Sequence, residues 1–119
     1  MLSENLLLRI ARACYAACNS WDTDHNPDAE MPIWDDADDA VKDAILTRIN
    51  KILTDPRAGD ATFHNVWLAQ QKADGWSSGR EYDEARKVDP LCVPFHLLPP
   101  EMQARERLFR AVTLSLSRV

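Results

Sequence analysis

Apolar residues recur at steps of three and four along most of this chain. That spacing places them on one face of an α-helix. The segments that show it are residues 3–20, 36–54, 63–74 and 100–117. Each carries polar or charged residues between its apolar positions, as a helix on the outside of a small core does. We therefore predict an all-α fold, a small bundle of about four helices with an irregular proline-rich loop packed across it.

Residues at the segment ends suggest where the helices begin and end. Ser3 and Thr62 are hydroxyl residues placed to cap the first and third helices. Gly75 can take the left-handed conformation that ends the third helix. A proline at position 99 or 100 suits the first turn of the last helix. Between Gly75 and that proline we expect a short helical turn at 83–87 and an extended segment at 93–95, because residues before proline avoid the helical region.

Two stretches lack a long helical period. Residues 22–35 contain two prolines and five acidic residues, and residues 76–100 contain four prolines. We predict loops for both, the first ordered near its end by Ile33 and Trp34. No repeat and no low-complexity tract divides the 119 residues, so we expect a single domain over 1–119.

Charge and composition narrow the function. With 14 Lys and Arg against 19 Asp and Glu, the formal net charge is −5, which argues against a binder of polymeric nucleic acid. No apolar run approaches the ~20 residues that a membrane span needs. Three cysteines and no signal-peptide pattern favour a protein of the cytoplasm with reduced thiols.

The cysteines and histidines leave two minor possibilities open. Cys14 and Cys18 are four residues apart, as are Cys92 and His96, so four zinc ligands are formally available. Cys92 with His64 is formally a nucleophile and base. The simpler interpretation is that the thiols are buried apolar residues. No phosphate-loop, dinucleotide or zinc-protease motif occurs, and we expect no enzyme, no metal and no cofactor.

Aromatic and basic residues are densest in residues 63–95. Trp67 and Trp76 lie there among Arg, Lys and Ser residues. Rings beside guanidinium and hydroxyl groups suit a stacked base together with a phosphate. The alternative is that both tryptophans are core residues that anchor the loop.

The same segment resembles the ryanodine-receptor (RyR) repeat. That family reads roughly H-x-x-W, then G-W-x-Y-G, then K-x-H-P-x-L-V-P-[YF]-x-x-L. The matching positions are His64, Asn65, Trp67, Gly75, Trp76, Gly79, Lys87, Pro90, Val93, Pro94, Phe95 and Leu98. The resemblance covers about residues 61–116, with 3–20 and 36–54 as preceding helices, and the short layout is similar to small RyR-domain proteins of bacteriophages and prophages.

The resemblance implies a helical module that binds a nucleotide without turning it over. In the receptors an adenine nucleotide lies between two repeats and stacks on the tryptophan that corresponds to Trp67. For phage proteins it implies ADP-ribose or cyclic ADP-ribose ligands, a homodimer that rebuilds the paired site in the host cytoplasm, and an anti-defence sponge for an immune messenger. The site residues it implies are His64, Trp67, Gln71, Trp76, Ser78, Arg80 and Lys87.

Three positions depart from the family pattern. Ser78 replaces the tyrosine of W-x-Y-G, Asp89 replaces the histidine of K-x-H-P, and Gln71 replaces a basic residue. All three lie in the segment that would form the ligand pocket, so they would alter which ligand it prefers. The competing hypothesis is a protein-interaction module in which Ile33 and Trp34 dock a partner and the motif is only scaffold.

Overall fold

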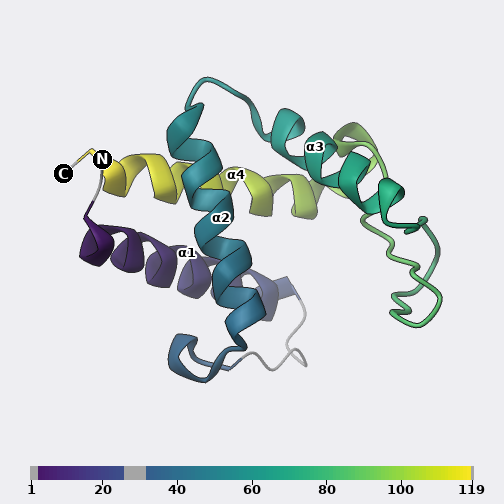
Figure 1. Cartoon of the computed structure of the whole chain (residues 1–119), viewed down its shortest axis with the longest axis horizontal. Coiled ribbons are helices and arrows are strands. Elements are labelled where there is room, and N and C mark those ends of the chain that lie inside the picture. Colours follow the sequence, from purple (N-terminus) through teal and green to yellow (C-terminus); the bar gives the residue numbers. More distant parts are fainter. Residues whose placement is uncertain (1–2, 26–31, 119) are drawn as a thin grey trace. The chain divides into compact units, whose positions relative to one another are not determined.

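A computed structural model describes residues 3–25 and 32–118 of the chain (Figure 1). The described part is helical, and its β-structure is limited to isolated bridges. The elements in chain order are α1 (Glu4–His25), the 3₁₀ turn η1 (Trp34–Asp36), α2 (Asp39–Thr54), α3 (Asp60–Ala73), the 3₁₀ turn η2 (Phe95–Leu97) and α4 (Pro100–Ser117). The predicted all-α class is confirmed.

The chain divides into two compact units, which we describe separately. The first unit comprises Met1–Arg57 and Arg105–Val119, and the second comprises Ala58–Ala104. Helix α4 begins in the second unit and ends in the first. The expectation of a single domain stays a prediction.

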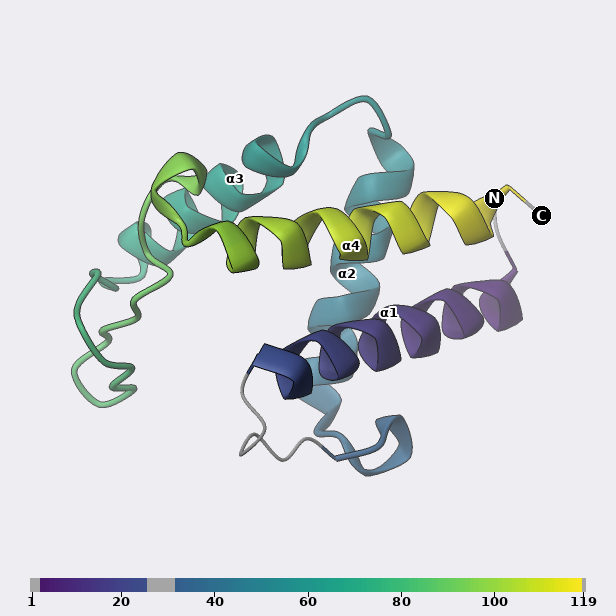
Figure 2. The same ribbon diagram turned by 180° about the vertical axis from the view of Figure 1, so that it is seen from behind.

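The core of the first unit lies between α1, α2 and the second half of α4. In both views α2 runs across the other two helices (Figures 1 and 2). Ile10 and Cys14 of α1, Ile49 and Ile52 of α2, and Thr113 of α4 are fully buried. The buried Thr113 hydroxyl donates to the Phe109 carbonyl at 2.9 Å, and its oxygen lies 3.3 Å from Cys14 Sγ. The buried Thr113 hydroxyl is therefore satisfied, as burial requires.

Two ion pairs in the first unit join half-buried charges. Arg105 donates two hydrogen bonds to Asp22, at 2.8 and 3.1 Å. Burial by itself would lower the pKa of Arg105, but its hydrogen bonds to Asp22 and nearby negative charge outweigh this and raise it. Arg48 pairs with Glu106, and its guanidinium lies 4.1 Å from the centroid of the Phe109 ring. Pairing offsets the cost of removing these charges from water.

Helix α1 has the predicted cap but is longer than predicted. The Leu6 amide donates to Ser3 Oγ at 3.2 Å, which confirms Ser3 as the cap. The helix continues to His25, so the expected end near residue 20 and the start of a loop at 22 are wrong. The Arg105–Asp22 pair joins the added turn to a residue 83 positions away. Residues 26–31 of the predicted loop lie outside the described residues.

Helix α2 begins three residues later than predicted. Trp34–Asp36 form η1, and α2 starts at Asp39 after Asp38 in extended conformation. Trp34 is only 8% exposed and meets the Tyr15 ring edge-on, with centroids 5.6 Å apart. The Trp34 ring thus fixes the chain at the point where α2 would otherwise begin.

In the second unit, α3 begins earlier than predicted. Gly59 occupies the cap position, so the prediction that Thr62 caps this helix is wrong. The Thr62 amide itself bonds to the Gly59 carbonyl at 3.1 Å, within the first turn. The other end agrees with the prediction. Gly75 has φ +93°, the Trp76 amide bonds to the Gln71 carbonyl and the Gly75 amide to the Lys72 carbonyl, which is a Schellman termination.

Candidate functional site

Two side chains of α3 hold the proline-rich segment on both sides of Pro94. His64 Nε2 lies 2.7 Å from the Val93 carbonyl, and Asn65 Oδ1 accepts the Phe95 amide at 3.1 Å. The predicted extended segment 93–95 ends at Pro94, because Phe95 begins η2. His64 is 7% exposed, and its ring lies 6.0 Å from that of Phe95. His64 and Asn65 thus form a clamp between α3 and η2.

Trp67 follows His64 by about one turn of α3. The two ring centroids are 5.3 Å apart and the planes are inclined by 37°. Trp67 is 36% exposed, and its neighbour Val66 is 56% exposed. Trp34 is buried and Trp21 and Trp76 are half-buried, so Trp67 is the tryptophan with the most accessible ring. An indole backed by a second ring on a regular helix is a fixed stacking surface.

The other predicted ligand residues lie in different parts of the second unit. Gln71 lies on α3 one turn after Trp67 and is half-buried. Trp76 follows the helix, and its ring centroid lies 5.8 Å from that of Tyr82. Ser78 is exposed in the loop beyond it. The structure thus brings His64 and Trp67 together and places Trp76 with a different aromatic partner.

A short hairpin occupies the place where a helical turn was predicted. Asp83 and Val88 exchange two backbone hydrogen bonds, at 2.8 and 2.9 Å. The Ser77 backbone bonds to the backbone on either side of Val88, at Lys87 and at Asp89. A Cβ on Gly79 would lie 2.3 Å from Val88 Cγ1. This close approach explains why glycine ends the G-W-x-x-G motif, and the prediction of a helical turn at 83–87 is wrong.

Lys87 helps to stabilise this hairpin through its backbone conformation and its side chain. Its φ of +56° is in the left-handed region. Its ammonium donates to the Asp74 carbonyl at the end of α3, at 2.7 Å, where the helix dipole favours a cation. Asp89, one of the departures from the family pattern, accepts the Leu91 amide at 2.8 Å. Both charges serve the loop itself in this structure.

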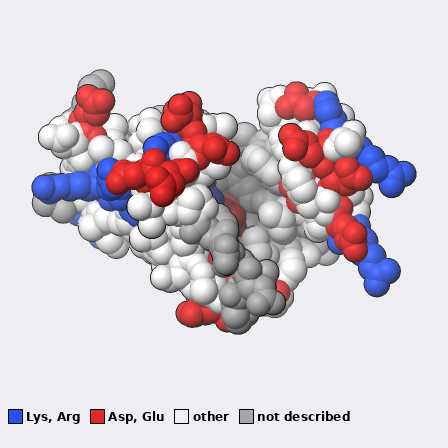
Figure 3. Space-filling model, turned by 90° about the horizontal axis from the view of Figure 1, so that it is seen from below, with Lys and Arg blue, Asp and Glu red and all other residues white. Residues whose placement is uncertain are grey.

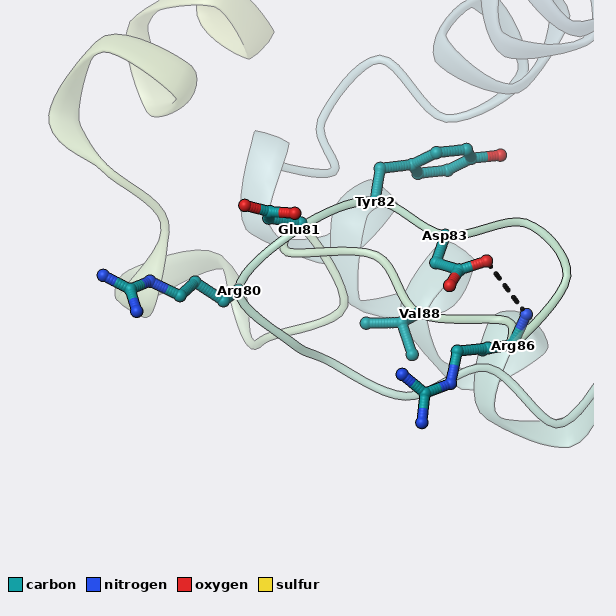
Figure 4. A pocket seen from close by; sticks show the side chains of 6 residues that line it. All are labelled: Arg80, Glu81, Tyr82, Asp83, Arg86 and Val88. Carbon is teal, nitrogen blue, oxygen red and sulfur yellow. Dashed lines mark hydrogen bonds between the residues drawn. The ribbon is translucent and has the colours of Figure 1, made fainter.

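A shallow pocket of about 390 Å³ opens on the hairpin (Figure 4). We call it the hairpin pocket. Its lining residues are Arg80, Glu81, Tyr82, Asp83, Arg86 and Val88. Of these, only Arg80 was predicted as a site residue. Tyr82 and Arg86 belong to the aromatic and basic stretch seen in the sequence, but their juxtaposition depends on the hairpin, which residue types alone did not reveal.

The cysteines are buried and free. Burial raises the pKa of the Cys14, Cys18 and Cys92 thiols, which opposes formation of a reactive thiolate. One His64 ring nitrogen, Nε2, already faces the Val93 carbonyl. Within residues 3–25 and 32–118, no group of three or more His, Cys, Asp and Glu side chains could hold a metal ion.

The surface charge is mixed. On the face shown in Figure 3, Lys and Arg side chains lie among Asp and Glu and form no continuous basic surface. None of the described helices is both long enough and apolar enough to cross a membrane.

The fold and the clamp define a class of helical module in which the H-x-x-W helix holds a proline-rich loop. The model of the RyR domain family matches residues 45–116. This is more than half of the chain, and the protein belongs to the RyR domain family. The match begins earlier than the predicted 61–116 and takes in the second half of α2. No curated protein and no solved structure matches the chain significantly.

Proposed function

We propose that the protein binds a small adenine-nucleotide-type ligand, such as ADP-ribose or cyclic ADP-ribose, without turning it over. The observation that carries this proposal is the accessible ring of Trp67 at the tryptophan position of the H-x-x-W motif. At 36% exposure the indole has a free surface, and the His64 ring at 5.3 Å supports it from within the unit. A base that stacks on such a ring gains about 1–3 kcal/mol.

Polar groups would fix the ligand around the stacked base. Gln71 lies one turn further along α3 and offers both a donor and an acceptor. Ser78 and Arg80 are exposed beyond the end of the helix, where they would meet hydroxyl and phosphate groups. Trp76 would serve as a second wall. Lys87 would contribute its charge to a phosphate only by giving up its bond to Asp74.

His64 has a different part in this proposal from the one predicted. Because its Nε2 faces the Val93 carbonyl, its contribution would be to support the Trp67 ring and the clamp. Direct hydrogen bonding to the ligand would need the other ring nitrogen.

A homodimer would complete the site. Val66 and Trp67 are adjacent and both exposed, and apolar side chains of this kind are suited to burial against a second copy. In a two-fold arrangement the same patch on each copy would meet the other, and two Trp67 rings would enclose one base. Light scattering with and without ligand would test this, and a strict monomer under both conditions would contradict it.

If the chain is of phage origin, tight binding without turnover would make it a sponge. It would lower the free concentration of a nucleotide messenger in the host cytoplasm and so blunt an immune response. This consequence depends on the affinity exceeding that of the host's own receptor for the messenger.

Isothermal titration calorimetry with ADP-ribose, cyclic ADP-ribose and ATP tests the binding. We expect saturable heat with at least one ligand and a loss of about tenfold or more in Trp67→Ala, since stacking contributes about 1–3 kcal/mol. Trp67→Phe keeps an aromatic face and should retain part of the affinity. Leu97→Ala is the matched control, because it removes another exposed apolar side chain, 61% exposed, that has no part in the proposed site. No heat with any ligand, or normal binding by Trp67→Ala, would contradict the proposal.

In the alternative hypothesis Ile33 and Trp34 dock a protein partner, but one of these two residues is buried. Trp34 is 8% exposed and packs against Tyr15, whereas Ile33 is 67% exposed. A partner that docks there would meet Ile33 and the acidic residues around it.

A further inference from the structure

The six residues that line the hairpin pocket include neither Trp67 nor Gln71, so the pocket is a different surface from the Trp67 ring. Its volume of about 390 Å³ is at the lower end of the range for small-molecule sites. A phosphate ion alone would leave much of such a pocket unfilled. The question is which ligand its side chains would recognise.

The pocket walls are held in place before any ligand binds. Asp83 and Val88 are joined by two backbone hydrogen bonds, and Gly79 lies against Val88 so closely that a Cβ would not fit. Lys87 ties the hairpin back to the end of α3. Little conformational entropy would therefore be lost from the backbone on binding, which favours affinity.

One guanidinium group beside the pocket, that of Arg86, is free to bind an anion. Within the described part of the chain, neither Arg80 nor Arg86 makes a side-chain hydrogen bond or ion pair. In Figure 4 the Arg86 side chain turns back beneath Val88, while Arg80 extends into open space at the other side. Guanidinium groups bind phosphate through paired N–H donors. The Asp83 carboxylate accepts the Arg86 amide at 3.2 Å and is thereby held against the backbone of the hairpin.

The remaining lining residues suit the hydroxylated part of a ligand. Glu81 is an exposed carboxylate, which accepts hydrogen bonds and so matches neighbouring hydroxyl groups. Val88 offers apolar surface against the C–H face of a sugar ring, whereas the Tyr82 ring lies on the opposite side of the chain in Figure 4, with its centroid 5.8 Å from that of Trp76. From these residues together we propose that the hairpin pocket binds a sugar phosphate, with the phosphate at Arg86 and the sugar hydroxyls at Glu81.

Amide NMR spectra of the full chain test this with three probes: ribose 5-phosphate, ribose and inorganic phosphate. We expect saturable shifts at residues 80–88 with ribose 5-phosphate, weaker binding of inorganic phosphate and no saturation with ribose. Arg86→Gln should weaken both phosphate-bearing probes by about tenfold, the usual effect of losing a charged hydrogen bond. Glu81→Gln should weaken ribose 5-phosphate and leave inorganic phosphate unchanged.

Two controls separate this site from the proposed nucleotide site. Arg107→Gln removes an exposed arginine outside the second unit and should leave all three titrations unchanged. Trp67→Ala should keep the ribose 5-phosphate shifts even if it loses nucleotide binding. The inference is overturned if ribose 5-phosphate gives no saturable shift, if inorganic phosphate binds equally tightly, if Glu81→Gln weakens both phosphate probes alike, or if Trp67→Ala abolishes the shifts.

Discussion

Lys87 combines an unfavourable backbone conformation with a favourable side-chain contact. Its φ of +56° costs an L-residue about 1–2 kcal/mol relative to glycine. The bond from its ammonium to the Asp74 carbonyl helps to close α3. We predict that Lys87→Gly is more stable than Lys87→Ala by about 1 kcal/mol, since both lose the ammonium and only glycine loses the strain. Urea unfolding followed by tryptophan fluorescence measures the difference.

A control at Ala69 should give the opposite result, with alanine more stable than glycine. Ala69 is exposed within α3, where alanine is favoured over glycine by about 1 kcal/mol. Ala69→Gly should therefore destabilise the protein. If Lys87→Ala is as stable as Lys87→Gly while Ala69→Gly behaves as expected, Lys87 does not hold a left-handed conformation in solution.

Single residues also show what the pattern of apolar positions can and cannot predict. Ile10, Cys14, Ile49 and Ile52 lie on the predicted apolar faces and are fully buried. Thr113 is equally buried but was not predicted, because a hydroxyl residue enters a core only where a partner exists, and its partner is the Phe109 carbonyl four residues earlier. His64 was predicted as a ligand contact, and the Val93 carbonyl that it faces is 29 residues away.

At the scale of elements, the clamp explains how α3 holds an otherwise irregular segment. Asn65 Oδ1 accepts the Phe95 amide, an amide that η2 does not satisfy internally. We predict that Asn65→Ala lowers the free energy of unfolding by about 1 kcal/mol. Asn65→Asp keeps an acceptor oxygen at this position and should stay close to the parent protein. Urea midpoints of the three proteins at neutral pH make the comparison.

Gln70 supplies a matched control on the same helix. Its amide donates to the Asp74 carboxylate at 3.2 Å on the exposed side, and a pair of this kind contributes only about 0.2–0.5 kcal/mol. Gln70→Ala should thus cost less than Asn65→Ala. Equal costs for the two, or a loss in Asn65→Asp as large as in Asn65→Ala, would mean that the acceptor at residue 65 is not what holds the loop.

Element boundaries were predictable where the signal is local. A proline start and an apolar stripe were enough for α4, which runs from Pro100 to Ser117 as predicted, and Gly75 ended α3 as expected. The errors have long-range causes. The extra turn of α1 carries Asp22, which pairs with Arg105. Trp34 is buried against the ring of Tyr15 on α1. The hairpin depends on the pairing of Asp83 with Val88, and no periodic pattern in the local sequence predicts that pairing.

At the scale of the whole molecule, the family motif and the two units do not coincide. The RyR match begins at residue 45, in α2 of the first unit, and runs through the second unit into α4. Every predicted ligand residue lies in the second unit. The match leaves α1 and the first residues of α2 outside it, while the residues that vary from the family pattern, Gln71, Ser78 and Asp89, are in the part that carries the candidate sites.

The two units differ in how completely their side chains are buried. The largest fully buried side chains, Ile10, Ile49, Ile52, Thr113 and Cys14, all belong to the first unit. The second unit is held by backbone bonds and the clamp more than by a fully buried core. Regions with fewer buried apolar contacts open at lower free energy, and a unit of this size buries too little surface to be more than marginal alone.

The cysteines report on the two units separately. Cys92 lies in the second unit, Cys14 and Cys18 in the first, and burial raises the pKa of all three thiols. At mildly alkaline pH the folded thiols are more protonated than unfolded ones and are covered, so alkylation requires opening. We predict that Cys92 is alkylated at lower urea than Cys14 and Cys18, as mass spectrometry of peptides from urea-pulsed samples would show. A Cys92→Ala protein should lack the early labelling phase, whereas simultaneous labelling of all three thiols would mean that the units open as one.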